Sequence, residues 1–243
     1  MIVERIQRPE ARVIAEEEFR RYAALCASFT DEEWRMDTDC TGWTVRDVTL
    51  HVLGSGDAQA STREFFHQFV RGLPLNRQID SHHWVDGLNE LQIRERRHLT
   101  NDELVAQLSA IGPKAVEGRW NTPAPVRHVP IPFGPPVGWV GLWYLLDVGF
   151  TRDVWAHRID LCAATGRSME PTPEHDGRLV ADLVGEWADI HGHAFELVLT
   201  GPAGGTFRQG VDGEHVEIDA IDFVRTLSGR LPGTGVLSHP LPL

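Results

Sequence analysis

The spacing of apolar residues changes along this chain, from helical over most of its length to alternating near its end. Residues 8–29 and 139–164 carry apolar side chains at intervals of three and four, the pattern of amphipathic helices. Residues 195–200, 206–209 and 215–219 are short runs with β-branched and aromatic side chains, which are typical of strands. Between the two patterns lies a segment rich in glycine, proline and polar residues, 165–177. The pattern therefore predicts a helical domain followed by a small α/β domain.

Two helix starts are marked by capping residues. Thr44 and Asp47 are three apart, as in a capping box with Asp in place of Glu, and the helical pattern that follows runs to Val70. Thr100 and Glu103 form the same signal before a second apolar stretch. We expect a helix to begin at each pair.

The remaining boundaries come from glycine and proline. A third helix is expected over residues 83–98, and Gly112 with Pro113 is expected to end the helix that Thr100 begins. Residues 121–138 contain too many prolines and glycines to be helical. We place the helical bundle domain at 1–166 and the small C-terminal α/β domain at 176–243.

Charge and composition narrow the class of partner. The 243 residues are 42% apolar, and 23 basic residues face 35 acidic ones, a net charge of −12. This charge repels nucleic acid and anionic membranes. No apolar run reaches the ~18 residues of a membrane span, the first residues lack the apolar stretch of a secretory signal, and the cysteines are few and scattered. We expect a cytoplasmic protein that binds neither nucleic acid nor membranes.

His51 is the first candidate for chemistry. It shares a predicted apolar helix face with Val48 and Val52. A histidine on such a face is more often a hydrogen-bonded part of the core than a metal ligand, so His51 alone does not indicate a site.

Asp153 and His157 form the second candidate. They are four residues apart on a predicted helix, so both side chains project from one side of it. A carboxylate and an imidazole at this spacing can share one metal ion. Two alternatives explain the spacing equally well: an ordinary Asp–His hydrogen bond, or a solvated face on which Arg152 and Arg158 extend into water.

Together, the three residues predict a catalytic metal site. Helical bundles build metal centres from side chains that face inward from different helices. His51, Asp153 and His157 offer three ligands, which leaves a coordination position open for a substrate. The nitrogen and oxygen ligands suit zinc, with nickel, iron and manganese as alternatives. Water at the open position would make the protein a hydrolase.

Three motifs, in order along the chain, resemble one protein family. The motifs are TGWTVRDVTLHVLG at 41–54, RDVWAHRIDL with ATG shortly after it at 152–166, and LTGPAGGTF through LSGR at 199–230. They are similar to motifs of the mycothiol-dependent maleylpyruvate isomerases, actinobacterial relatives of the DinB-like helical bundles. The resemblance implies a DinB-like four-helix bundle followed by a small C-terminal α/β domain.

The resemblance also implies ligands and roles. The family binds zinc through two histidines and a glutamate, and His51 and His157 match the histidines. Asp153 stands where the family's isomerase has glutamate, and its shorter side chain must approach the metal more closely. The family implicates an arginine near the end of the C-terminal domain, which matches Arg230 in LSGR.

The implied reaction is an isomerisation assisted by a low-molecular-weight thiol, mycothiol in this family. Zinc stabilises the thiolate, which adds to an activated cis alkene; the new single bond rotates and the thiolate leaves with trans geometry. Arg230 is expected to bind the substrate carboxylate through two parallel hydrogen bonds. We expect an isomerase or S-transferase acting on a small, carboxylated electrophile such as maleylpyruvate. A non-catalytic, ligand-binding member of the family is the alternative.

Overall fold

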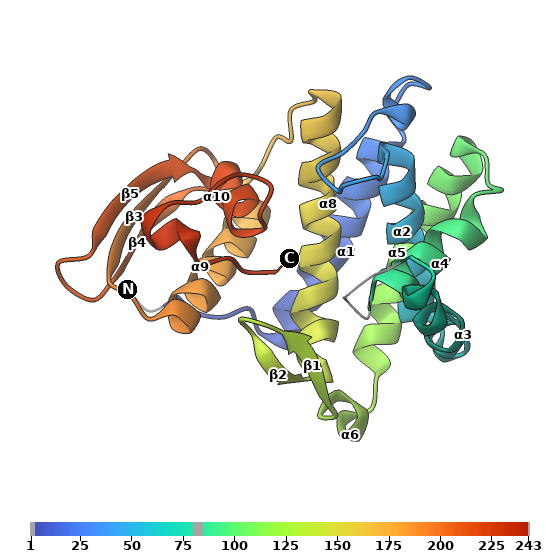
Figure 1. Ribbon diagram of the computed structural model, residues 1–243, viewed down its shortest axis with the longest axis horizontal. Coiled ribbons are helices and arrows are strands. Elements are labelled where there is room, and N and C mark those ends of the chain that lie inside the picture. The colour runs from blue at the N-terminus through green and yellow to red at the C-terminus, as the bar shows by residue number, and fades with distance from the viewer. Residues whose placement is uncertain (1–2, 80–84, 243) are drawn as a thin grey trace. The chain divides into compact units, whose positions relative to one another are not determined.

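The protein is mostly helical, with a small sheet near its C-terminus (Figure 1). The computed structural model describes residues 3–79 and 85–242. None of the helices so described is long and apolar enough to cross a membrane. The predicted fold class is confirmed. In chain order the elements are α1 (Arg8–Cys26), η1 (Glu33–Arg35), α2 (Val45–Ala60), α3 (Thr62–Gly72), η2 (Leu73–Arg77), α4 (Asp86–Arg96), α5 (Asn101–Asn121), α6 (Ala124–Arg127), β1 (Pro130–Gly134), β2 (Gly138–Gly141), α7 (Leu142–Tyr144), the π-helical turn η3 (Leu145–Gly149), α8 (Phe150–Thr165), the π-helical turn η4 (Pro173–Gly177), α9 (Arg178–His191), β3 (Phe195–Thr200), β4 (Gly205–Gln209), β5 (Glu214–Asp219), α10 (Ala220–Leu227) and η5 (Gly235–Ser238).

The chain packs into two compact units, each assembled from separate stretches. The helical unit consists of the described residues of 12–124 together with 160–167. The mixed unit consists of the described residues up to Ala11, 125–159, and those from Ser168 onward. Helices α1 and α8 each contribute residues to both units.

The predicted domain bounds, 1–166 for the helical bundle and 176–243 for the small α/β domain, stay a prediction. In the packed structure, the mixed unit includes two stretches that precede residue 166. One of them carries Arg5, and the other carries the first turns of α8.

Both capping boxes in the helical unit form as predicted. At the start of α2, the Thr44 hydroxyl accepts a hydrogen bond from Asp47 N (3.2 Å), and the Asp47 carboxylate accepts one from Thr44 N (3.1 Å). Thr100 and Glu103 make the same reciprocal bonds at the start of α5, at 3.2 and 2.7 Å. Each pair satisfies backbone amides that the first turn of a helix leaves without a partner.

The helix predicted to run from Thr44 to Val70 is two helices. Ser61 adopts an extended conformation after α2, and its hydroxyl accepts a hydrogen bond from Glu64 N, which caps α3 (3.3 Å). The apolar residues after the break do not mark a buried face, because Phe65, Phe66 and Val70 of α3 are exposed. The helix predicted over 83–98 is α4, and the first residues of that range lie outside the described part of the chain.

The prediction that Gly112 and Pro113 end a helix was wrong. Helix α5 continues through Pro113 to Asn121, because close packing holds it on both sides of the proline. A Cβ atom on Gly112 would lie 2.8 Å from Phe19 Cβ of α1, and one on Gly118 would lie 2.2 Å from the Gln59 carbonyl oxygen of α2. Burial along the whole helix outweighs the single backbone hydrogen bond that proline removes.

The segment predicted to be non-helical, 121–138, forms the one-turn helix α6 and most of a hairpin. Strands β1 and β2 pair antiparallel from Pro130 and Gly141 inward. The long helical stretch predicted to begin at residue 139 therefore begins at Leu142, because Trp139 and Val140 are used in β2.

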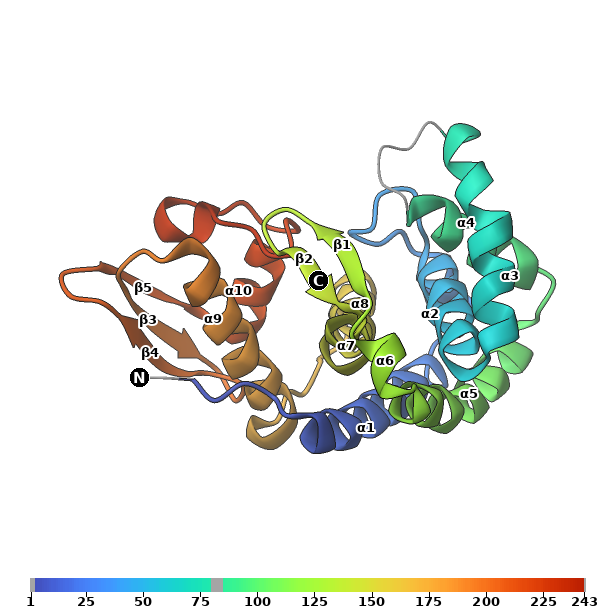
Figure 2. The same ribbon diagram turned by 90° about the horizontal axis from the view of Figure 1, so that it is seen from below.

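The three strands predicted near the C-terminus form one sheet of the mixed unit, in the order β4-β3-β5 (Figure 2). β3 is antiparallel to β4 and parallel to β5. Phe195, Leu197 and Leu199 of β3 are buried on the face that α9 and α10 cover. The loop between β4 and β5 crosses the start of β3 at Gly213, where a Cβ atom would lie 2.3 Å from Phe195 N. Only glycine permits this crossing.

A buried ion network joins the elements of the mixed unit. On α8, Arg152 donates to Glu186 Oε2 (2.6 Å) and Asp182 Oδ2 (2.7 Å) of α9. Arg5 donates to the same two carboxylates at 2.9 Å, and the Tyr144 hydroxyl donates to Glu186 at 2.5 Å. Burial raises the pKa of Asp182, but the charges of Arg152 and Arg5 outweigh burial and hold that pKa below its ordinary value.

A second buried pair fixes the segment before α9. Arg158 of α8 donates to Asp176 Oδ1 at 2.6 Å, and Trp155 Nε1 donates to the same oxygen at 3.0 Å. The other Asp176 oxygen accepts a hydrogen bond from Thr172 N at 2.8 Å. Burial raises the pKa of Asp176, and the opposing effect of Arg158 and these hydrogen bonds leaves it lowered.

Replacing Arg152 with methionine tests how much this network stabilises the fold. Arg152→Met removes one of the two arginines that balance the buried negative charges of Asp182 and Glu186. We therefore expect the free energy of unfolding to fall by about 3–5 kcal/mol. Urea unfolding at pH 7 measures the change. The control is Arg94→Met, which removes a surface ion pair with Glu90 and is expected to leave stability unchanged within about 0.5 kcal/mol. Equal effects of the two substitutions would contradict the prediction.

Three histidines stack near the end of α9 in the mixed unit. The ring centroid of His239 lies 5.3 Å from that of His191 and 4.8 Å from that of His193. His191 Nδ1 accepts a hydrogen bond from His193 N (3.0 Å), and the His191 ring packs on Trp187. Burial, together with the neighbouring histidines, lowers the pKa of His191 to about 4.

The lowered pKa of His191 predicts that the folded protein loses stability as the pH falls toward 4. The unfolded chain protonates this histidine near its ordinary pKa of 6.5, whereas the folded chain protonates it only near 4. The stability that depends on neutral His191 is therefore complete above pH 6.5 and is lost as the pH falls from 6.5 to 4. We expect His191→Gln to reduce the fall in melting temperature over this range, and exposed His215→Gln to leave it unchanged. Identical pH profiles for His191→Gln and wild type would refute this.

Candidate metal centre

The predicted carboxylate–imidazole pair lies on α8, within the mixed unit. His157 Nε2 is 3.5 Å from Asp153 Oδ1, and the side chain of His157 is only 9% exposed. A tetrahedral ion bound at ~2.0–2.1 Å holds neighbouring ligand atoms roughly 3.3–3.4 Å apart. The observed separation fits that spacing and is long for a hydrogen bond. The residues present therefore fit two ligands of one metal ion.

The alternative in which this part of α8 is a solvated face is wrong. Arg152 and Arg158 are 2% and 3% exposed, and both are bound to carboxylates of the mixed unit rather than extended into water. A helix with two buried arginines needs acidic partners nearby. Those partners, Asp176, Asp182 and Glu186, lie in η4 and α9.

His51 lies on α2, within the helical unit, and is 5% exposed. Its Nδ1 is 2.7 Å from Gln92 Oε1 of α4, and its ring lies 5.3 Å from that of Trp43. Histidines that bind metals commonly use one ring nitrogen for the metal and the other for a hydrogen bond that orients the ring. Nothing in the local sequence pattern of α2 indicates Gln92, because the partner comes from another helix.

The predicted ligands belong to both units. Asp153 and His157 face each other on α8 of the mixed unit, and His51 is held by its own neighbours in the helical unit. That all three bind one ion stays a prediction.

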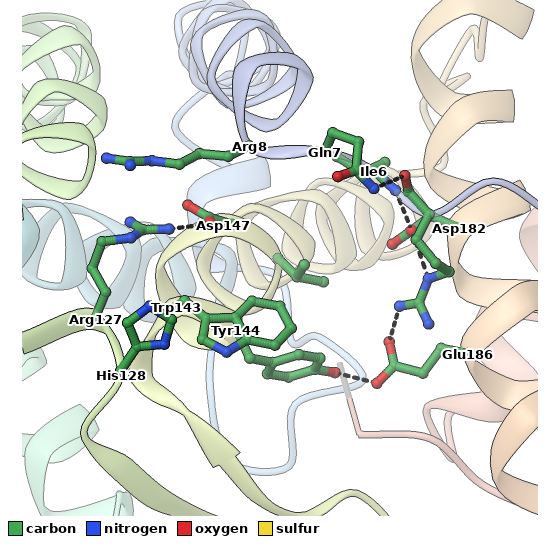
Figure 3. Close-up of a pocket in the computed structure, with 12 residues that line it drawn as sticks. Ile6, Gln7, Arg8, Arg127, His128, Trp143, Tyr144, Asp147, Asp182 and Glu186 are labelled. Carbon is green, nitrogen blue, oxygen red and sulfur yellow. Dashed lines mark hydrogen bonds and ion pairs between the residues drawn. The ribbon is translucent and has the colours of Figure 1, made fainter. Parts of the chain in front are cut away.

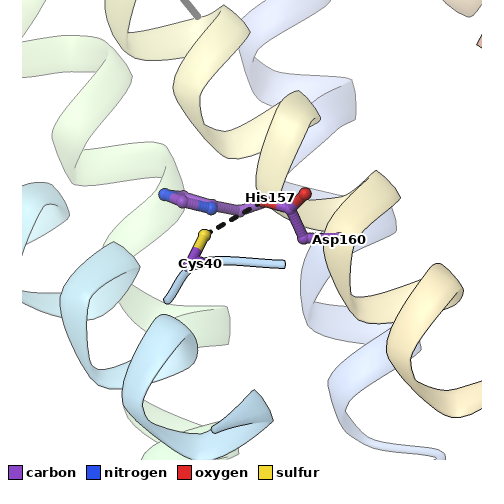
Figure 4. Close-up of side chains that lie close together, drawn as sticks. All are labelled: Cys40, His157 and Asp160. Atoms are coloured by element: carbon purple, nitrogen blue, oxygen red, sulfur yellow. Dashed lines mark hydrogen bonds between the residues drawn. The ribbon is translucent and has the colours of Figure 1, made fainter. Parts of the chain in front are cut away.

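A cysteine and an aspartate interact in the helical unit. Cys40 Sγ lies 3.3 Å from Asp160 Oδ2, and Asp160 follows His157 by three residues on α8 (Figure 4). Cys26 is buried 3.8 Å from Thr49 Oγ1, and burial raises the pKa of its thiol. Burial of this kind favours the protonated, inert thiol.

Arg230 follows α10 in the mixed unit and is partly buried. Its backbone amide bonds to the Arg225 carbonyl at 2.8 Å, and its Nη1 donates to the Ser228 carbonyl at 3.4 Å. Gly229, with a φ of +79°, allows the chain to turn at the end of the helix. The role of Arg230 in anion binding stays a prediction.

A cavity of about 560 Å³ opens within the mixed unit, and sequence reasoning did not find it. Its walls come from the first residues of the chain, from α6 and α7, and from α9. Arg127 is ion-paired with Asp147, and the Tyr144 hydroxyl points to Glu186 (Figure 3). Arg5 and Arg127 of this wall are thus already matched by carboxylates.

One further histidine of the helical unit lies beside a carboxylate. His67 Nε2 is 2.8 Å from Glu95 Oε1, and both side chains are more than a third exposed. Exposed pairs of this kind contribute little to stability.

Comparison with known proteins identifies solved structures that share this fold. Two solved structures, a mycothiol-dependent maleylpyruvate isomerase and a histidine-to-alanine mutant of it, each match with a TM-score of 0.57 and 16% sequence identity. Each match covers 93% of this chain and 90% of the other. A comparison with curated protein sequences finds no match. At this identity, the likeness shows that the fold is shared.

The family follows from the sequence. The fold is that of a helical bundle joined to a small α/β part, and residues 15–162 match the model of the mycothiol maleylpyruvate isomerase N-terminal domain. Because the match spans more than half of the chain, this protein belongs to the mycothiol maleylpyruvate isomerase family. His51, Asp153 and His157 lie inside the matched segment, and Arg230 lies outside it.

Proposed function

We propose that this protein is a metal-dependent isomerase or S-transferase that uses a low-molecular-weight thiol, in the first instance mycothiol. Its substrate is a small carboxylated electrophile such as maleylpyruvate. The observation that carries the proposal is the Asp153–His157 pair, whose ligand atoms are separated as two ligands of one ion would be. Membership of the family supports the choice of thiol and substrate class.

His51, Asp153 and His157 are the residues that would hold the metal. Two imidazoles and one carboxylate form the ligand set of many catalytic zinc sites, which leave a position open. A bound zinc ion lowers the pKa of a thiol, so that the thiolate is available at neutral pH. The thiol of Cys26 does not supply this thiolate, because it is fully buried.

Arg230 supplies the substrate contact in this proposal. Its guanidinium can bind a carboxylate through two parallel hydrogen bonds, which orients the substrate as well as attracting it. The thiol adds to the cis double bond of the substrate, the resulting single bond rotates, and the same thiol departs from the trans product. No atom is gained or lost overall, so one thiol serves many turnovers.

The metal ligands are tested by analysis of metal content. We expect gently purified wild-type protein to carry about one zinc per chain, with ligand distances of ~2.0–2.2 Å in X-ray absorption spectra. His51→Ala and His157→Ala should each lose the metal to a chelator, because two remaining ligands rarely hold a divalent ion. His67→Ala, at the exposed pair with Glu95, is the control and should retain it. Metal-free wild-type protein, or equal retention in all three variants, would show that the assignment is wrong.

The role of Arg230 is tested by substitution with lysine. Arg230→Lys keeps the charge but loses the paired hydrogen bonds, so we expect thiol-dependent turnover of maleylpyruvate to fall by about 1.5–3 kcal/mol, roughly ten- to a hundredfold. Metal content and melting temperature should stay unchanged. Arg208→Lys, at an exposed position on β4, is the matched control and should keep full activity. Unaltered turnover in Arg230→Lys would remove this residue from the site.

The same assay tests the reaction class. Omission of the thiol should abolish turnover by the wild-type protein. Product formed by hydrolysis without any thiol would favour the hydrolase alternative, in which water takes the open position.

A further inference from the structure

A chain of buried amide groups leads away from His51 within the helical unit. His51 Nδ1 is 2.7 Å from Gln92 Oε1, and Gln92 Nε2 donates to Gln68 Oε1 at 2.8 Å. Gln68 Nε2 then donates to the Gly54 carbonyl oxygen at 2.8 Å. His51, Gln68 and Gln92 are 5%, 1% and 6% exposed, and they come from α2, α3 and α4.

The Gly54 carbonyl, at the end of this series of side chains, determines the direction of every hydrogen bond between them. A backbone carbonyl can only accept, so the group of Gln68 that faces Gly54 must be the amide NH₂. The same NH₂ group donates to Glu64 Oε1 at 2.9 Å, and that carboxylate also only accepts because it is ion-paired with Arg96. Gln68 therefore turns its carbonyl oxygen to Gln92. Gln92 must then present its NH₂ to Gln68 and its oxygen to His51.

The direction of these hydrogen bonds determines the tautomer of His51. Because Gln92 Oε1 is an acceptor, the nitrogen opposite it must carry the proton, which places N–H on Nδ1. In a neutral imidazole with the proton on Nδ1, the lone pair is on Nε2. A histidine in water prefers the opposite arrangement, with the proton on Nε2.

We propose that Gln92 and Gln68 are positioning residues that hold His51 in the tautomer whose Nε2 can bind a metal. This inference rests on the proposed function, since the metal gives the tautomer its purpose. Gln92 acts on His51 directly, and Gln68 acts only through Gln92. Orienting partners of this kind typically change metal affinity ten- to a hundredfold when they are removed.

Packing holds the amide chain in place. A Cβ atom on Gly54 would lie 2.5 Å from Gln92 Cβ, so glycine at this position of α2 lets the Gln92 side chain pass. Arg96 donates to the Gln92 carbonyl at 3.1 Å and binds Asp57 of α2 through two nitrogens, at 2.7 and 2.9 Å. These contacts fix α4 against α2 at the level of His51.

The test begins with the metal-free protein and ¹⁵N NMR of its histidine rings. We expect His51 of the wild type to show a protonated Nδ1 and an unprotonated Nε2. In Gln92→Leu the acceptor is gone, and in Gln68→Leu the Gln92 amide is free to turn over, so both should populate the Nε2–H tautomer. Gln59→Leu, which removes an amide bonded to Ser55 on the same helix, should leave the His51 signals unchanged.

A conservative variant separates the tautomer from packing. Gln92→Glu keeps an acceptor opposite His51, so the Nδ1–H tautomer should persist there while Gln92→Leu loses it. Titration with cobalt(II) should show affinity reduced about ten- to a hundredfold in Gln92→Leu and Gln68→Leu, and retained in Gln59→Leu. Melting temperatures identify variants that are folded, and Gln68→Leu carries the test if Gln92→Leu does not fold.

The outcomes of this inference and of the proposed function are distinguishable. If the tautomer is the same in wild type, Gln92→Leu and Gln68→Leu, the inference is overturned whether or not the protein binds metal. If the tautomer shifts as expected but the wild type binds no divalent ion, the amide chain is supported and the proposed metal function fails. A shifted tautomer with weakened cobalt binding supports both.

Discussion

Two buried arginines on α8 determine how this protein presents its proposed metal-binding pair, Asp153 and His157. Arg152 and Arg158 are each bound to carboxylates of the mixed unit, and removing such a partner costs several kcal/mol. Successive helix residues are rotated by roughly 100°, which places Asp153 and His157 on the side of α8 opposite the two arginines. Rotation of α8 would break both ion pairs. The arginines thus hold the Asp153–His157 face in one direction, and the rest of the proposed site depends on that orientation.

The features predicted correctly from the sequence are those that arise from neighbouring residues. The capping boxes at Thr44 and Thr100 join residues three apart, and they formed as expected. The alternation in residues 195–200 likewise marked β3. One incorrect boundary arises from contacts with other elements: α5 continues past Pro113 because α1 and α2 pack against both of its halves. The hairpin of β1 and β2 arose in a segment whose prolines indicated only that a helix was excluded.

The same distinction separates what was found and what was missed at the site. Asp153 and His157 are one turn apart, so their meeting on α8 follows from helix geometry alone. The solvated alternative failed because Arg152 meets Asp182 and Glu186, which lie thirty or more residues further along the chain. Gln68 and Gln92 carried no signal, since an amide is common on helices and the contact requires three helices to pack correctly. Hydrogen-bond direction in a buried chain is a property of the fold, not of any local pattern.

The charges of the proposed site explain why an arginine is needed in addition to the metal. Two neutral histidines and one carboxylate carry a single negative charge, so a divalent ion held by them leaves a net charge of +1. One thiolate cancels this charge. No positive charge then remains for a substrate carboxylate, in a protein whose net charge is −12 and whose general field repels anions. Arg127 is already paired with Asp147, and Arg5 and Arg152 are bound to Asp182 and Glu186. A carboxylated substrate therefore requires a further guanidinium, which is the role we propose for Arg230.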